Sequence, residues 1–187
     1  MLRKLSLAAL ALIAAPAFAQ EDGAGPNIVI EVDGQTKGQI VIDLADHVAP
    51  KHVAQIVALT KEGAYDDVVF HRVIDGFMAQ TGDVQYGKAG GSAQAGMGGS
   101  SKPDLAAEFS DLSFDRGVVG MARSADPNSA NSQFFIMFAP APHLDGQYTV
   151  VGKVISGMEV VDAIKKGEGG NGEVSSPDRM AKVTVQE

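Results

Sequence analysis

The sequence predicts a mainly β protein folded as a closed antiparallel barrel with helices packed at its ends. Eight short runs of β-branched or alternating apolar residues are bounded by Gly, Asp, Asn or Pro, which is typical of strands. Only two segments have the apolar spacing of a helix, one early and one late in the chain. Closure suits this pattern because it removes the sheet edges that invite aggregation. The length of 187 residues is enough for one domain with a substantial core and too short for two ordinary ones.

The predicted strands are residues 27–32, 38–44, 68–74, 77–80, 118–122, 133–138, 149–155 and 182–186. Alternate residues of a strand share one face of the sheet. In the sixth run, Gln133 and Phe135 therefore point together, while Phe134 and Ile136 point to the opposite side. This alternation predicts that the two faces of this strand lie in different surroundings.

Two segments predict helices. In residues 47–63, Pro50 suits the first helical turn, apolar residues recur on one face, and Gly63 supplies a stop. Residues 158–166 again have an apolar face, with two lysines at the end that favours cations. The glycine-rich segments 87–103 and 167–177 have little to bury, and we interpret both as surface loops.

Residues 1–19 have the layout of a secretory signal peptide. Arg3 and Lys4 precede an apolar stretch over 5–15, and a small-x-small cleavage site ends at Ala19. The apolar stretch is too short to span a bilayer, which needs about 20 residues. We therefore expect residues 20–187 to form a single domain that is exported, to the periplasm, and is not held in a membrane after cleavage.

Composition and missing motifs exclude several function classes. The 15 Lys and Arg residues against 23 Asp and Glu give a net charge of -8, which disfavours nucleic-acid binding. The chain has no cysteine, so disulfides, thiolate metal sites and cysteine nucleophiles are excluded. It has no Gly-x-Ser-x-Gly elbow and no His-Glu-x-x-His zinc motif. We expect no metal and no cofactor.

One group of motifs is not explained by a plain barrel core. The motifs are Phe-His-Arg-Val-Ile-Asp-Gly-Phe-Met-Ala-Gln-Thr-Gly-Asp over 70–83, Asn-Ser-Gln-Phe-Phe-Ile over 131–136, and His-Leu-Asp-Gly-Gln-Tyr over 143–148. They place Arg72, Gln80 and Gln133 among large apolar residues. A core accounts for the aromatic residues, but polar groups beside them need partners.

These segments resemble the cyclophilin family of peptidyl-prolyl cis/trans isomerases, and the resemblance runs in order from about Asn27 to the end of the chain. It implies a closed eight-stranded antiparallel β-barrel capped by two α-helices, which agrees with the eight predicted strands. It implies an enzyme that isomerises X-Pro bonds in proline-containing polypeptides without metal or nucleotide. Together with the leader, it points to unfolded exported proteins as substrates of a monomeric enzyme.

The chemistry explains why an arginine is needed. An X-Pro bond rotates over a barrier of about 18–20 kcal/mol, and no covalent bond has to break. Twisting localises a lone pair on the prolyl nitrogen, which a fixed cation with N–H donors can bind without proton transfer. The resemblance assigns this role to Arg72.

The same resemblance assigns substrate binding to Phe77, Met78, Gln80, Ala122, Arg123, Gln133, Phe135, His143, Leu144 and Tyr148. Phe77, Met78, Phe135 and Leu144 are expected to line an apolar pocket for the proline ring. Gln80 is expected to orient Arg72 and contact the substrate, Ala122 and Arg123 to pair with the peptide backbone, and Gln133 to bond a carbonyl.

The chain departs from the best-known eukaryotic pattern at three of these positions. His143 stands where many members have Trp, Tyr148 where His is usual, and Arg123 where Asn is common. In the family the Trp position matters for tight cyclosporin binding, so the resemblance does not extend to cyclosporin sensitivity.

A second function class stays open at this point. The same groove could hold exported polypeptides as a chaperone module, with isomerisation incidental. Arg72 favours the enzyme, because a pure binder has no need of that guanidinium. A purely structural role has no positive support in the sequence.

Overall fold

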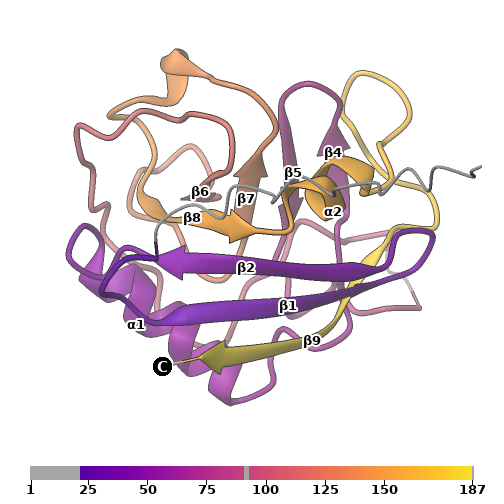
Figure 1. The fold of residues 1–187 in the computed structure, drawn as a ribbon, viewed down its shortest axis with the longest axis horizontal. Helices are drawn as coiled ribbons and strands as arrows, with labels where there is room; N and C mark the ends of the chain where they lie inside the picture. Colours follow the sequence, from indigo (N-terminus) through magenta and orange to yellow (C-terminus); the bar gives the residue numbers. More distant parts are fainter. Residues whose placement is uncertain (1–21, 91–92, 187) are drawn as a thin grey trace, which may run out of the picture.

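Nine antiparallel strands form one strongly curled sheet in the computed structural model, which describes residues 22–90 and 93–186 (Figure 1). The strands are β1 (Asn27–Asp33), β2 (Gly38–Leu44), β3 (Val68–Val69), β4 (Arg72–Ile74), β5 (Met78–Thr81), β6 (Val118–Met121), β7 (Phe134–Met137), β8 (Val150–Ser156) and β9 (Arg179–Gln186). The helices are α1 (Pro50–Lys61) and α2 (Met158–Ala163), and η1 (Pro142–Leu144) is a single 3-10 turn. The predicted signal peptide, residues 1–19, lies outside the described residues.

The sheet is open, which corrects the prediction of a closed eight-stranded barrel. The strand order is β3-β9-β1-β2-β8-β6-β7-β5-β4, so β3 and β4 are the two ends. These ends are consecutive in the chain because the predicted strand 68–74 breaks at Phe70 and His71. The Phe70 N–H donates to the Asp178 carbonyl, and the His71 carbonyl accepts from the Val174 N–H. The covalent chain, rather than a ladder between β3 and β4, completes the curl, and the break turns eight strands into nine.

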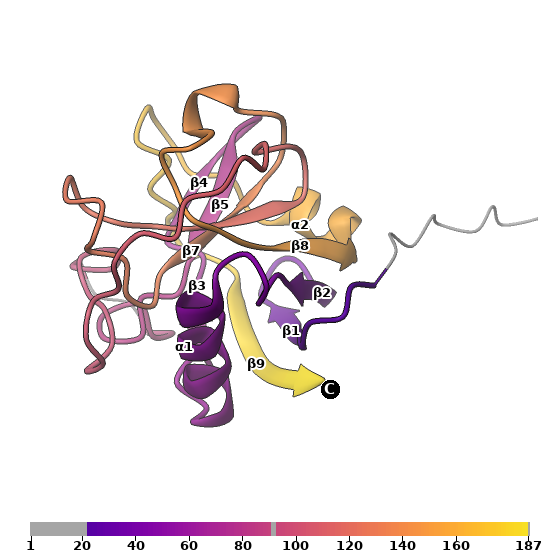
Figure 2. The ribbon, with the colours of Figure 1, turned by 90° about the vertical axis from the view of Figure 1, so that its left-hand side faces the viewer.

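The curl has a local cause in the strand pairing. The register shifts between Glu31 and Val32, between Val41 and Ile42, and between Val119 and Gly120. An irregularity of this kind bends a strand and increases its twist. Figure 2 shows the result in β9, which curves along its length between its neighbours β3 and β1.

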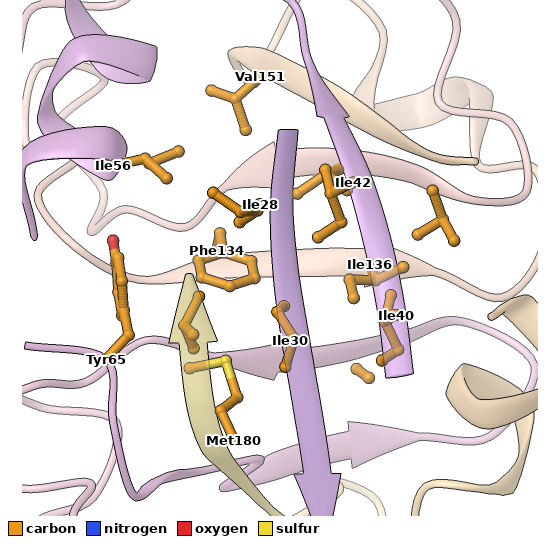
Figure 3. Close-up of a cluster of buried hydrophobic side chains, with 14 of the residues drawn as sticks. Ile28, Ile30, Ile40, Ile42, Ile56, Tyr65, Phe134, Ile136, Val151 and Met180 are labelled. Carbon is orange, nitrogen blue, oxygen red and sulfur yellow. The ribbon is translucent and has the colours of Figure 1, made fainter. Parts of the chain in front are cut away.

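The larger hydrophobic core lies inside the curl, where the inward residues of the sheet meet α1. Figure 3 shows the labelled side chains at its centre, which are Ile28, Ile30, Ile40, Ile42, Ile56, Tyr65, Phe134, Ile136, Val151 and Met180. The buried Tyr65 hydroxyl keeps a partner there, because it donates to the Ser132 carbonyl at 2.9 Å. Burial raises the pKa of the Tyr65 hydroxyl, so it stays a neutral donor.

A second, smaller apolar cluster lies on the opposite face of β5, β6 and β7. Its buried members are Met78, Phe114, Val118, Phe135, Met137, Ala141, Leu144 and Val150. Within β7, Phe134 and Ile136 belong to the larger core and Phe135 and Met137 to the smaller cluster. The predicted alternation along this strand is therefore confirmed.

Both predicted helices are present, at the left (α1) and the right (α2) of Figure 1. α1 begins at Pro50, as predicted, and ends at Lys61. α2 ends at Ala163, before the predicted end at residue 166, because Ile164 has an extended backbone with ψ 133°. None of the helices among the described residues combines the length and the apolar character needed to cross a membrane.

Candidate active site

The hairpin formed by β4 and β5 places Arg72 beside Gln80. The two residues are paired in register, and the turn between the strands contains Gly76 with φ +69°, a conformation that glycine adopts without strain. Arg72 is half-buried. Its Nη1 donates to Gln80 Oε1 at 3.2 Å, and its Nε donates to the Asn171 carbonyl at 3.0 Å. Two bonds from different segments therefore fix the plane of the guanidinium.

Gln80 is held in turn by Gln133. The Gln80 side-chain amide donates to Gln133 Oε1 at 2.9 Å. The Gln133 side-chain amide donates to the Gly96 carbonyl at 2.9 Å and to the Gly98 carbonyl at 2.7 Å. Both N–H groups of Gln133 are thus already engaged, so a bond from Gln133 to a substrate carbonyl would have to replace one of them.

Ten residues line one cleft of about 340 Å³: Arg72, Phe77, Met78, Gln80, Ala122, Arg123, Phe135, His143, Leu144 and Tyr148. The structure thus brings together all the residues predicted for the site except Gln133. Gln133 lines a neighbouring cavity of about 540 Å³, which shares Gln80, Ala122 and Arg123 with the cleft. The two cavities therefore adjoin each other along these three residues.

The floor of the cleft is apolar. Met78, Phe135 and Leu144 are buried and belong to the smaller cluster. The ring of Phe114 stacks against the ring of Phe135, with centroids 5.7 Å apart, and supports it from below. An apolar floor of this size suits a proline ring, which carries no N–H group.

Aromatic and cationic side chains form the rim. The rings of Phe77 and His143 stack with centroids 5.8 Å apart, and Tyr148 meets Phe135 edge-on at the same distance. The Arg123 guanidinium lies 4.3 Å from the centre of the Tyr148 ring. Its Nη1 donates to the Ser124 carbonyl and its Nη2 to the Gln147 carbonyl. Arg123 therefore joins the two segments that border the groove.

The electrostatics of the cleft are cationic, because Arg72 and Arg123 line it and none of its described lining residues is acidic. His71 lies next to Arg72 in the chain and is buried, and this burial lowers the pKa of its imidazole despite the nearby Asp83 carboxylate. His71 is therefore neutral at neutral pH. Among the described residues, no group of three or more His, Asp or Glu side chains could hold a metal ion.

Sequence reasoning missed the groups that support this site from behind. Asp83, Gly96 and Gly98 lie in or beside the segment interpreted as a plain surface loop, and Phe114 was not singled out. The described part of that loop is fixed to the site, since Gly96 and Gly98 bond Asp83 through their N–H groups and Gln133 through their carbonyls. The signals in the sequence were Gln133, whose amide needed partners, and Asp83, which ends the motif over 70–83 but was given no role.

The chain is similar to known proteins over most of its length. The family model described as "Cyclophilin type peptidyl-prolyl cis-trans isomerase/CLD" matches residues 28–185. A probable peptidyl-prolyl cis-trans isomerase of Brucella suis biovar 1 is 61% identical over 153 residues, covering 80% of this chain and 78% of that protein. The peptidyl-prolyl cis-trans isomerase-like 3 of Gallus gallus is 44% identical over 130 residues, covering 69% of this chain and 77% of that protein.

Solved structures show the same similarity. A cyclophilin from Hirschia baltica has a TM-score of 0.70 and 27% identity, covering 84% of this chain and 73% of its own. A cyclophilin type peptidyl-prolyl cis-trans isomerase of Cryptosporidium parvum, crystallised in the presence of the dipeptide Ala-Pro, has a TM-score of 0.70 and 26% identity. The match covers 86% of this chain and 99% of that one.

Proposed function

The chain belongs to the cyclophilin-type peptidyl-prolyl cis-trans isomerases and is such an isomerase, and we propose that Arg72 is the group that stabilises the twisted X-Pro bond. The observation that carries the proposal is the position of this guanidinium at an apolar cleft, fixed by Gln80 and the Asn171 carbonyl. A guanidinium has five N–H donors. The two bonds to Gln80 and Asn171 leave Nη2 without a hydrogen bond in the described part of the chain.

Stabilising the twisted bond needs no proton transfer. The planar amide is held by resonance, and twisting transfers electron density to the prolyl nitrogen as a lone pair. A donor that meets this lone pair binds the transition state better than either planar isomer, which is the requirement for catalysis. Lowering the barrier by about 7 kcal/mol would accelerate rotation by roughly five powers of ten.

The substrate is anchored on both sides of the bond that rotates. The proline ring occupies the apolar floor formed by Met78, Phe135 and Leu144. The peptide before the proline runs along Ala122 and Arg123, where the Ala122 N–H already donates to the Gln133 carbonyl. In an extended strand the N–H and C=O of the next residue point to the opposite side, so backbone pairing with the substrate uses the N–H and C=O of Arg123. Holding both sides lets one side turn while the other stays fixed.

The test of the Arg72 proposal is the variant Arg72→Ala. We expect kcat/KM for an X-Pro peptide to fall by about 100-fold or more, with an unchanged fold by circular dichroism. Arg179→Ala is the matched control, since Arg179 pairs with Asp33 and Asp67 away from the cleft, and its kcat/KM stays near that of the wild type. Exchange rates near wild type in Arg72→Ala would refute the proposal.

We also propose that the clients are exported proteins whose folding waits for prolyl isomerisation. The support is the leader pattern of residues 1–19, which predicts export of a single domain over 20–187 to the periplasm. The protein purified from its host should begin at Gln20 and separate with the periplasmic fraction; a mature chain that begins at Met1 contradicts the proposal. Light scattering on the same sample tests the predicted monomer.

Catalysis and holding differ in stoichiometry. If turnover is the function, trace amounts of the protein accelerate the slow refolding phase of a client limited by a proline bond. A chaperone that only holds its client needs about one molecule for each client chain. The same assay with Arg72→Ala removes acceleration that depends on the guanidinium and leaves holding unchanged.

A further inference from the structure

A buried carboxylate outside the cleft holds the loop behind Gln133. Asp83 follows β5 and is 0% exposed. One of its oxygens, Oδ1, accepts from the N–H groups of Gln85 and Tyr86 at 3.1 and 2.8 Å. The other, Oδ2, accepts from Gly96 at 2.7 Å and Gly98 at 2.9 Å. Two bonds to each oxygen use the full accepting capacity of an ionised carboxylate.

The two loop residues bonded by Asp83 are the ones that hold Gln133. The N–H groups of Gly96 and Gly98 donate to Asp83, and the carbonyls of the same residues accept from Gln133 Nε2. The loop therefore lies between a carboxylate on one side and a side-chain amide on the other. Asp83 sets the position of the loop, and this position determines where the two carbonyl acceptors of Gln133 lie.

The loop also passes close to the buried His71 ring. Gly96 has φ +96°, and a Cβ atom on it would lie 2.8 Å from Cδ2 of the buried His71 ring. A methyl group there would overlap the ring, so the chain passes this close to His71 only because residue 96 has no side chain. The carboxylate and the imidazole together define one position of the peptide units around Gly96.

The orientations of the Gln133 and Gln80 side-chain amides link the position of the loop to Arg72. Two carbonyls require the NH₂ end of Gln133, so its oxygen must face Gln80. That oxygen requires the NH₂ end of Gln80, so the Gln80 oxygen must face the Arg72 guanidinium. If either side-chain amide were reversed, two donors or two acceptors would face each other with little access to water, which is unfavourable.

We propose that Asp83 is a positioning residue of the isomerase, which fixes the orientation of Arg72 through the Gly96–Gly98 loop, Gln133 and Gln80. The inference rests on the role proposed above for Arg72. It makes the buried carboxylate a determinant of the rate although it does not touch the substrate.

The first experiment compares Asp83→Asn with Asp178→Asn. An amide at position 83 keeps one acceptor oxygen but turns an NH₂ group toward two backbone N–H groups, so the loop loses its fixed position. We expect kcat/KM to fall about 10- to 100-fold. Asp178 is the matched control, because it is 1% exposed and accepts the N–H groups of Thr36 and Lys165 away from the cleft. Asp178→Asn stays within about twofold of the wild type.

The second experiment separates positioning from general destabilisation by a double-mutant cycle. If Asp83 acts through Gln133, then in the Gln133→Ala background the further change Asp83→Asn lowers kcat/KM by less than about twofold. All assays are run well below the melting temperature of each variant. Wild-type kcat/KM in Asp83→Asn overturns the proposal, and so do losses that multiply in the double variant.

A third variant covers the case in which Asp83→Asn fails to fold. Gly96→Ala displaces the loop directly and leaves the carboxylate intact, so it should also lower kcat/KM about 10-fold or more, and this loss should be absent from the Gln133→Ala background. Wild-type kcat/KM in Gly96→Ala overturns the proposal. Arg72→Ala distinguishes the role proposed for Arg72 from the role proposed for Asp83. If Arg72→Ala is inactive while Asp83→Asn is fully active, only the positioning role of Asp83 fails.

Discussion

The cleft floor depends on a residue without a side chain. Gly120 in β6 is paired in register with Phe135 in β7. A Cβ atom at this position would lie 2.5 Å from Phe114 Cε1 and 2.6 Å from Phe135 Cζ. Two rings that already stack on each other cannot both give way in a packed cluster. The absence of a side chain at Gly120 is therefore what allows the rings of Phe114 and Phe135 to stack at the floor of the cleft.

For Gly120→Ala we expect a loss of stability of about 1–3 kcal/mol, the usual cost of overpacking. Because the displaced Phe135 ring moves into the cleft, KM for an X-Pro peptide should rise more than kcat falls. Urea unfolding measures the first effect and steady-state kinetics the second. Gly170→Ala is the control, since a methyl group there would have no atom within 4 Å and a change of under about 0.5 kcal/mol is expected. An unchanged KM in Gly120→Ala would show that the floor is not rigid.

At the scale of elements, the start of α1 depends on a side chain from a distant loop. The residue before the helix, Ala49, provides no side-chain cap. The N–H groups of Lys51 and His52 donate instead to Glu108 Oε2, each at 3.1 Å, and the His52 ring lies 2.6 Å from the same oxygen. A carboxylate here satisfies free N–H groups and favours the positive end of the helix.

The Glu108 carboxylate makes this helix start sensitive to acid. Burial opposes ionisation, but the bonds from His52 and Lys51 outweigh it and lower the pKa of Glu108 below its ordinary value of 4.5. A lowered pKa gives stability that is present above 4.5 and is lost as the pH falls through the pKa of the folded state. Glu108→Gln should therefore cost about 1 kcal/mol at neutral pH, and this difference from the wild type should shrink below about pH 4.5.

Urea unfolding of both proteins across that range measures the difference. Glu62→Gln is the matched control, because Glu62 is an exposed carboxylate at the other end of α1 that pairs with Lys102. Exposed pairs of this kind contribute between zero and about 1 kcal/mol. A stability difference between wild type and Glu108→Gln that does not change with pH would contradict the role given to the ionised carboxylate.

Local signals predicted most elements, and long-range bonds account for what they did not predict. The alternation in β7 and the Pro50 start of α1 are properties of neighbouring residues, so the sequence alone predicts them. The break of the predicted strand 68–74 depends on bonds to residues about a hundred positions later, such as that from Phe70 to Asp178. The periodicity of neighbouring residues does not predict hydrogen-bond partners that are distant in the sequence.

The same distinction holds for the site. The resemblance predicted that Arg72, Phe135 and the other lining residues share one cleft, and the structure shows them lining one cleft. The support from Asp83 and Gly96 could not be predicted from composition, because a glycine-rich segment has the pattern of a free loop until the partners of its N–H groups are known. Only the folded chain shows that its peptide units lie between a carboxylate and an amide.

At the scale of the whole molecule, the two faces of the sheet have different roles, one in stability and the other in forming the cleft. Its inner face builds the larger core with α1, and its outer face over β5, β6 and β7 builds the floor of the cleft (Figure 3 shows the inner side). Because side chains alternate, adjacent residues of one strand serve opposite purposes. The fold can therefore hold a shaped apolar cleft at its surface without weakening its interior.

Phe134 and Phe135 test this separation with the same chemical change on the same strand. Phe134→Leu removes ring atoms from the larger core, so it should lower the free energy of unfolding on the order of 1–3 kcal/mol and leave KM and kcat of the folded enzyme unchanged. Phe135→Leu lies in the cleft, so it should raise KM for an X-Pro peptide while costing less stability. Urea unfolding and steady-state kinetics on both variants, at a temperature where both are folded, measure the four quantities. If Phe134→Leu raised KM as much as Phe135→Leu, the two faces of the sheet would not be independent, and the cleft would depend on the packing of the interior.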